Sequence, residues 1–188
     1  AGIPGRSYTD ITCISRGVHH LFWKARTAVD IGSQYSRVIR LNEKGRNTDF
    51  LLSERCAGGS GRLLQTIAHV LGVKLEDIGR LSMKATSPVR FNTGCAVFAE
   101  TEAISRVAEG ETIEDILAGV NNALAAKIGS LIERMGAEQD IVLTGGGAKD
   151  EGLVRSLQGL LGVAIFVPDE PQIVAAMGAA VTHSYKRS

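Results

Sequence analysis

The chain has 188 residues, of which 44% are hydrophobic and 22% are charged. This length and composition suffice for one packed core, and they exclude a disordered tail, a collagen-like repeat and a small disulfide-rich protein. With Lys+Arg 21 and Asp+Glu 20 the formal net charge is +1, so no basic surface for nucleic acid is indicated.

The longest apolar stretch, residues 173–181, is far too short to span a membrane, so we expect no membrane association. No secretory signal is recognisable, and three widely spaced cysteines do not suggest a disulfide framework. We therefore expect a cytoplasmic protein.

The first third of the chain predicts a small β-meander. Residues 1–24 are predicted to be an irregular entry with a short apolar patch. Strands are expected over 26–31, 36–41 and 48–53, separated by short turns rich in Gly, Ser and Asn.

Helices are predicted to dominate the middle of the chain. Apolar residues recur at helical spacing from Leu63 to Leu71, and a polar, irregular insert follows over 75–93. A helix is expected from Cys95 towards Ala108. The longest predicted helix begins at Thr112, with an apolar stripe at Ile113, Ile116, Leu117, Val120, Leu124, Ile128, Leu131, Ile132 and Met135. Thr112 and Asp115 resemble a capping box.

The C-terminal part alternates strand and helix. The strand over 141–144 runs into three glycines, a helix is expected over 149–161, a strand over 164–167 and a last helix over 171–185. Buried strands connected by crossover helices indicate an α/β fold with parallel strands.

The first candidate site follows the first strand, where Asp30 precedes the turn Gly32-Ser33-Gln34. A carboxylate at a strand end can hold Mg²⁺, and the backbone N–H groups of a glycine turn can approach a phosphate. Gln34 could orient an attacking water. A plain hairpin turn with a capping Asp is the alternative.

The second candidate is the triple glycine Gly145-Gly146-Gly147 between a strand and a helix. Three consecutive glycines cost conformational entropy, which a planar ligand or a phosphate lying against the backbone would justify. The motif is neither GxGxxG nor a P-loop, so neither of those sites is indicated. A simple tight turn remains the alternative.

The third candidate is a pair of cysteines, Cys56 and Cys95, each in a loop of small residues leading into a predicted helix. A thiolate at a helix N-terminus is stabilised by the helix dipole. Two thiolates are half of a tetrahedral sulfur site, so a metal or cluster would need two more ligands, which a symmetric dimer supplies. Two free cysteines are the alternative.

Taken together, these segments resemble the ATPases that activate 2-hydroxyacyl-CoA dehydratases and the ATP-binding subunits of benzoyl-CoA reductase. The resemblance runs almost end to end and is carried by the stretches 9–13, 26–32, 56–61, 95–100, 142–149 and 171–173. The two cysteine motifs occurring in this order with the triple glycine are specific to that family.

The resemblance implies an actin-like, ribonuclease-H-like lobe with a mixed sheet and helices on both faces. Residues 1–26 would be the end of the first lobe and its connector, and residues 27–188 the second lobe. The first phosphate loop of such ATPases would lie before residue 1, so the first lobe would be largely missing.

The resemblance also implies the ligands. ATP or ADP with Mg²⁺ would bind with Asp30, Gly32, Ser33 and Gln34 at the phosphates, Asp30 and Gln34 being the catalytic candidates. The residues expected on the adenosine side are Gly145, Gly146, Gly147, Lys149 and Gln172. A dimer, of identical or of two related chains, would share one [4Fe–4S] cluster through Cys56 and Cys95 of each chain.

The implied activity is ATP-dependent transfer of one electron from a ferredoxin or flavodoxin donor, through this cluster, to a partner acting on an acyl-CoA in anaerobic metabolism. The turn differs from the family's usual Gly-Gly-Gln-Asp, because this chain has Gly32-Ser33-Gln34-Tyr35. Asp10 also stands where Glu is usual. An actin-like nucleotide-binding or docking module without redox activity is the competing hypothesis.

Overall fold

The computed structural model describes residues 7–53, 57–91 and 96–184. In that part of the chain five strands form one mixed sheet in the order β3-β2-β1-β4-β5. The strands β1, β2 and β3 pair antiparallel, whereas β4 is parallel to β1 and β5 is parallel to β4. The strands are β1 Thr27–Ile31, β2 Ser36–Leu41, β3 Asn47–Leu52, β4 Ile141–Thr144 and β5 Ile165–Phe166. The predicted meander and the predicted parallel strands are both confirmed.

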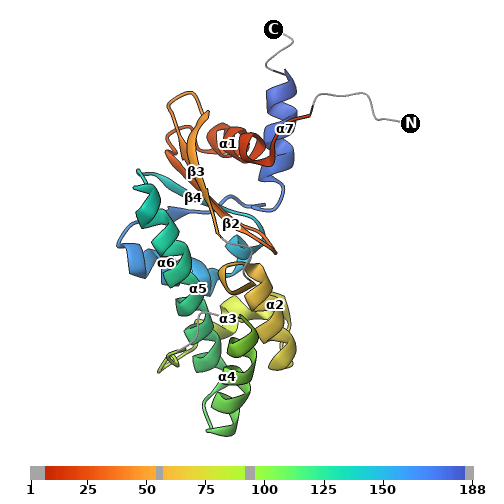
Figure 1. The fold of residues 1–188 in the computed structure, drawn as a ribbon, viewed down its shortest axis with the longest axis vertical. Coiled ribbons are helices and arrows are strands. Elements are labelled where there is room, and N and C mark those ends of the chain that lie inside the picture. The colour runs from red at the N-terminus through yellow and green to blue at the C-terminus, as the bar shows by residue number, and fades with distance from the viewer. Residues whose placement is uncertain (1–6, 54–56, 92–95, 185–188) are drawn as a thin grey trace, which may run out of the picture.

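Helices cover both faces of this sheet and extend beyond one end of it (Figure 1). The helices are α1 Asp10–Leu21, α2 Gly61–Val70, α3 Ile78–Ser82, α4 Ala96–Ala108, α5 Ile113–Met135, α6 Glu151–Leu161 and α7 Val174–Ser184. Short 3₁₀ turns occupy Ala57–Gly59, Leu75–Asp77 and Gly146–Lys149. None of the helices in the described ranges is long and apolar enough to cross a membrane.

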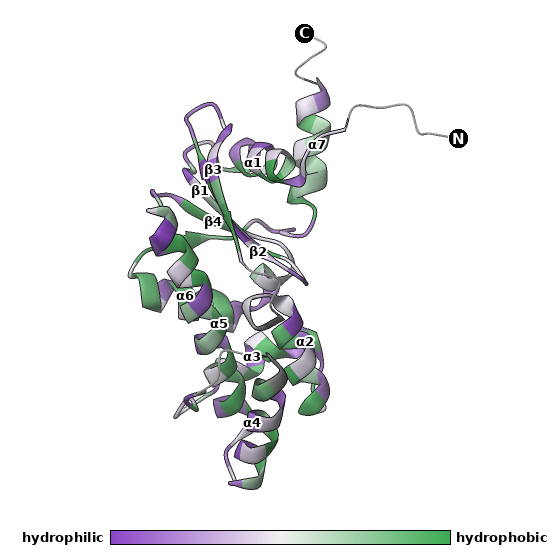
Figure 2. Cartoon of the chain, in the orientation of Figure 1, coloured by the Kyte–Doolittle hydropathy of each residue, from purple (hydrophilic) through white to green (hydrophobic). Residues whose placement is uncertain are grey.

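The alternation of side chains along the strands explains the two helical layers. Ala28, Ile39 and Val142 pack with Ile14, Val18 and Val174, so they face α1 and α7. Val29, Val38 and Leu143 belong to the larger core beneath α2, α5 and α6. The sheet is therefore buried on both faces, as near-continuous apolar strands require. Figure 2 shows green apolar segments alternating with purple polar ones along α2 and α4, as expected of helices with one buried side.

The prediction that residues 1–24 are irregular is wrong for the helix α1. Thr9 caps this helix by accepting a hydrogen bond of 3.2 Å from the N–H of Thr12. Its buried side combines the apolar Ile14 and Val18, which pack on the sheet, with the small residues Cys13, Ser15 and Gly17. Cys13 is a buried free thiol.

The expected irregular insert over 75–93 is only partly irregular, because it contains α3. The loop after α3 is fixed by the start of α5. Thr112 accepts a hydrogen bond of 3.1 Å from the N–H of Asp115, which confirms the predicted helix start. The Asp115 carboxylate accepts bonds from the N–H groups of Thr86 and Ser87, at 2.9 and 2.7 Å. Thr112 thus caps α5, and Asp115 in the first turn of the helix anchors the loop.

Candidate functional site

A cavity of about 640 Å³ lies at the C-terminal ends of β1 and β4. Ligands of open α/β sheets bind at the carboxyl ends of parallel strands, so this is where the topology favours a site. Five segments distant in sequence meet there: the turn after β1, the start of α2, the turn Leu75–Asp77, the glycine turn after β4, and the loop before α7. The lining residues are Gly32, Ser33, Gly61, Leu64, Gln65, Leu75, Glu76, Gly146, Gly147, Lys149, Asp150 and Gln172.

The turn after β1 is held by the first residues of α2. The N–H of Gly61 donates a hydrogen bond of 2.9 Å to the carbonyl of Gly32, and the Ser60 hydroxyl donates one of 3.0 Å to the carbonyl of Ser33. A Cβ atom at Gly61 would lie 3.1 Å from the Gly32 oxygen. The small residues at 60 and 61 therefore let the helix start close against the turn and fix its shape.

The three glycines after β4 pack directly on the end of β1. Gly145 has φ +82°, and a Cβ there would lie 2.5 Å from the carbonyl oxygen of Ile31. A Cβ at Gly147 would lie 2.4 Å from the Ile31 side chain. Close packing against the backbone and side chain of Ile31 thus explains Gly145 and Gly147. Gly146 lines the cavity, and a Cβ there would lie 3.3 Å from the amide nitrogen of Gln172.

Asp30, the last residue but one of β1, is not among the residues that line this cavity, and it is the cross-strand partner of both Arg37 on β2 and Thr144 on β4. Its Oδ1 accepts a hydrogen bond of 3.1 Å from the Thr144 hydroxyl, and its Oδ2 lies 3.0 Å from Nη1 of Arg37. Burial raises the pKa of Asp30, while Arg37 and the Thr144 hydrogen bond act in the opposite direction. The carboxylate is therefore held by two neighbours in a poorly hydrated place.

Asp150 is a wall residue that the sequence reasoning did not single out. Its Oδ1 caps α6 by accepting a hydrogen bond of 3.0 Å from the N–H of Leu153, and it accepts a second one from the Asn121 amide. Burial raises its pKa, and these hydrogen bonds offset only part of that rise. Its position directly after the Gly-Gly-Gly-Ala-Lys stretch was the available signal.

The structure brings together six of the predicted site residues, because Gly32, Ser33, Gly146, Gly147, Lys149 and Gln172 all line the cavity. Lys149 extends towards Glu170, with 3.4 Å between the charged atoms. Gly145 lies behind the lining against Asp30. Gln34 is exposed and is not among the lining residues, so its predicted role in orienting water stays a prediction.

Cys56 and Cys95 lie outside the described residues, so their predicted role stays a prediction. The segments that follow them are described and lie close together, because α4 contacts both α2 and the 57–59 turn. In the described part of the chain, no group of three or more His, Cys, Asp or Glu side chains is placed to hold a metal ion. Figure 1 shows α2 and α4 beside each other, at the end of the molecule away from α1.

A second cavity, of about 480 Å³, lies between α3, α5 and α6. Asn121 and Gly152 line it, and Asn121 donates a hydrogen bond of 3.1 Å to Asp150, which lines the first cavity. The two cavities are therefore separated by one layer of side chains.

Comparisons with known proteins agree with this architecture. The model of the BadF/BadG/BcrA/BcrD ATPase family matches residues 4–182. The chain is 37% identical to the 2-hydroxyisocaproyl-CoA dehydratase activator of Clostridioides difficile over 176 residues, which are 94% of this chain and 66% of that protein. The solved structure of such an activator from Clostridium difficile with bound ADPNP has a TM-score of 0.94 at 34% identity, and covers 100% of this chain and 72% of its own.

Two further relatives have related names. The (R)-2-hydroxyglutaryl-CoA dehydratase activating ATPase of Acidaminococcus fermentans is 35% identical over 187 residues, covering 100% of this chain and 71% of that protein. A subunit of the benzoyl-CoA reductase of Thauera aromatica is 36% identical over 186 residues, covering 95% of this chain and 66% of that protein. The chain thus spans about two thirds of the length of these curated relatives.

The actin-like α/β fold expected from the sequence is confirmed by the strand order and by the similarity to these solved activators. The chain belongs to the BadF/BadG/BcrA/BcrD ATPase family.

Proposed function

We propose that this chain is the nucleotide-binding and cluster-holding part of an ATP-hydrolysing activator, which delivers single electrons to a dehydratase or reductase acting on an acyl-CoA. The observation that carries the proposal is the cavity at the ends of β1 and β4, whose walls come from the predicted phosphate turn and the predicted adenosine turn. A structural relative with a TM-score of 0.94 was solved with ADPNP bound, which supports a nucleotide as the ligand.

In this proposal the turn Gly32-Ser33 contacts phosphates, and Gly146 with Gln172 contacts the nucleoside. The volume of about 640 Å³ suits a ligand of nucleotide size. For Mg²⁺ we propose Asp30, next to that turn, because the ion is usually bound through one or two carboxylates together with substrate phosphates and water. Its oxygens are oriented by Thr144 and Arg37 in advance of any ligand.

We further propose that residues 27–188 form the second actin-like lobe and that residues 1–26 are the end of the first lobe. The sheet and its larger core begin at β1, which supports this boundary. The helix α1 crosses α7 closely, because a Cβ at Gly178 would lie 1.7 Å from the carbonyl oxygen of Cys13. This crossing packs the two proposed parts directly against one another.

For the cluster we propose Cys56 and Cys95 as the two ligands from each chain of a dimer. The proximity of α4 to α2 and to the 57–59 turn supports this, because both cysteines directly precede these neighbouring segments. A [4Fe–4S] cluster bound there would supply one-electron redox chemistry. The contribution of the protein is to present thiolates near two helix N-termini, whose dipoles favour negative charge.

Equilibrium binding of ADPNP tests the nucleotide site. We expect Gly146→Val to weaken binding at least tenfold, because the new side chain occupies the cavity beside the flexible Gln172. Gly159→Val is the matched control, since a Cβ at Gly159 meets nothing within 4 Å and the residue does not line this cavity. No binding by the unmodified chain would favour the docking-module hypothesis.

A further inference from the structure

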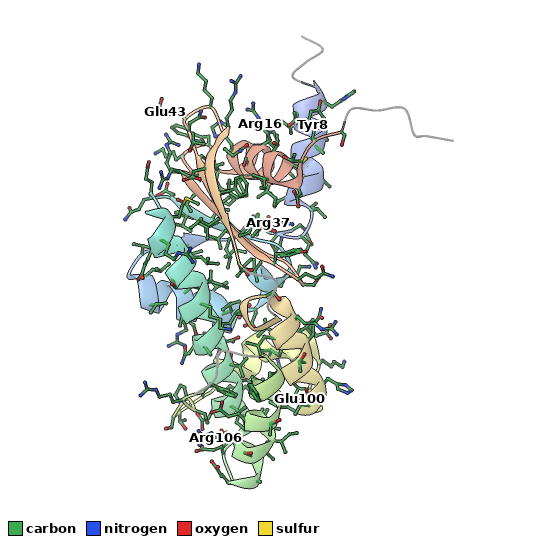
Figure 3. The ribbon with its side chains drawn as sticks, in the orientation of Figure 1. Tyr8, Arg16, Arg37, Glu43, Glu100 and Arg106 are labelled. Atoms are coloured by element: carbon green, nitrogen blue, oxygen red, sulfur yellow. The ribbon has the colours of Figure 1, made fainter. Side chains whose placement is uncertain are left out.

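Arg37 bridges two carboxylates that come from different elements. Its Nη1 lies 3.0 Å from Oδ2 of Asp30 at the end of β1, and its Nη2 lies 2.6 Å from Oδ2 of Asp10 at the start of α1. The Arg37 and Asp30 side chains are 19% and 13% exposed, whereas Asp10 is 59% exposed. The guanidinium thus links α1 to the strand that leads into the Gly32-Ser33 turn (Figure 3).

This arrangement occupies the oxygen that a cation needs. Oδ1 of Asp30 accepts the Thr144 hydroxyl, and Oδ2 faces the guanidinium of Arg37. A hydrated Mg²⁺ ion uses carboxylate oxygens directly or through its waters. Because Mg²⁺ and guanidinium are both positive and would share Oδ2, the ion and the Arg37–Asp30 bond exclude one another or weaken one another.

If Arg37 releases Asp30, its guanidinium still has two other partners. Asp10 is already within ion-pair distance, and the Tyr35 ring lies 5.9 Å from the guanidinium carbon, within the range of a cation–π contact. A partly buried cation that lost its only partner would be costly, but this one keeps a carboxylate and an aromatic ring.

We propose that Arg37 is a positioning residue that holds Asp30 before the Mg–nucleotide binds and yields Asp30 to Mg²⁺ on binding, keeping Asp10 as its partner. The inference rests on the proposed nucleotide site and deepens it by naming what regulates access to its metal-binding carboxylate. It makes Arg37 a competitor of Mg²⁺, and Asp10 the residue that relieves this competition. The occupancy of the site is thereby coupled to the start of α1.

The experiment measures ADPNP affinity with Mg²⁺ and with EDTA, and compares the ratio of the two dissociation constants between variants. For Arg37→Met we expect the gain in affinity from Mg²⁺ to increase about fivefold or more, because a competing positive charge is removed. Arg37→Lys keeps the charge, so its ratio should stay near that of the unmodified chain.

Arg16→Met is the matched control. Arg16 lies on α1, carries the same charge, and donates a hydrogen bond of 2.8 Å to the carbonyl of Lys44, beyond the opposite end of β2. Figure 3 labels both arginines. Its loss should leave the Mg²⁺ ratio unchanged even if it lowers stability.

Asp10→Asn keeps the inference testable if Arg37→Met folds poorly, because Asp10 is exposed and its replacement is mild. Without this partner Arg37 should hold Asp30 more firmly, so the gain from Mg²⁺ should decrease. An unchanged or smaller ratio in folded Arg37→Met, or an unchanged ratio in Asp10→Asn, would overturn the inference. An unmodified chain that binds ADPNP neither with Mg²⁺ nor with EDTA would overturn the proposed nucleotide site, whereas a chain that binds ADPNP but shows the ratios just named overturns the inference alone.

Discussion

Asn121 donates a hydrogen bond of 3.1 Å to Asp150, and these two residues separate the two cavities. Each of them also has an oxygen, Oδ1 of Asn121 and Oδ2 of Asp150, that is buried and has no hydrogen-bond partner among the described residues. Buried polar groups of this kind are costly. The layer between the cavities is thus a place where the protein gives up stability.

The first prediction follows from Asp150. Burial raises its pKa in the folded protein, so its ionisation opposes folding, and the stability present at acid pH is lost as pH rises through the raised pKa. Asp150→Asn keeps one oxygen for Leu153 and Asn121 and removes the charge. We expect the variant to be more stable than the unmodified chain at neutral pH, by about 1 kcal/mol.

Denaturant unfolding between about pH 4 and pH 8 measures this effect, and the advantage of Asp150→Asn should shrink towards the acid end. Asp150→Ala is the comparison, because it also removes the cap of α6 and should cost about 1 kcal/mol. An Asn variant that is less stable than the unmodified chain at neutral pH would contradict the account of Asp150.

The contribution of Asp115 to stability should depend on pH in the direction opposite to that of Asp150. The hydrogen bond from Thr112 and those from the N–H groups of Ser87 and Thr86 lower its pKa. Its contribution to stability is therefore present above the ordinary carboxyl pKa and is lost as pH falls through the lowered value. We expect Asp115→Asn to be less stable at neutral pH, with a shallower loss of stability in acid. Amide exchange at Thr86 and Ser87 should accelerate in this variant, and unchanged exchange there would argue against the anchoring role.

The crossing of α1 and α7 gives a test of packing. A Cβ at Gly178 would lie 1.7 Å from the carbonyl oxygen of Cys13, so we expect Gly178→Ala to force the helices apart and to destabilise the chain by about 1–3 kcal/mol. In α6 a Cβ at Gly159 meets nothing within 4 Å, and Gly159→Ala should stabilise by about 0.5–1 kcal/mol. Thermal unfolding of both variants measures this difference. Melting temperatures that shift in the same direction and by a similar amount would contradict it.

The sequence predicted elements well where one residue pattern decides the outcome. The strand over 36–41 and the helix beginning after Thr112 have the bounds expected from their periodicity and cap. The helix α1 was missed although the sequence carried its signals, since Ile11, Ile14 and Val18 recur at helical spacing after the cap Thr9.

Part of the candidate site could likewise be predicted from the sequence and part could not. The two glycine turns could be predicted because their residue types are unusual. Arg37 and Thr144 could not, because they meet Asp30 only through the register of β1 with β2 and with β4. For Arg37 a partial signal existed, because Asp30 and Arg37 lie two residues before and two residues after the turn 32–35 and therefore pair in the hairpin.

The central claim is that two chains hold one redox cluster through Cys56 and Cys95. The most direct test is the iron and sulfide content of anaerobically purified protein, together with its native mass. The account predicts about four irons and four sulfides per pair of chains, and their loss in Cys56→Ser and in Cys95→Ser, whereas Cys13→Ser retains them. Protein that contains no iron and cannot be reconstituted with iron and sulfide would contradict the claim.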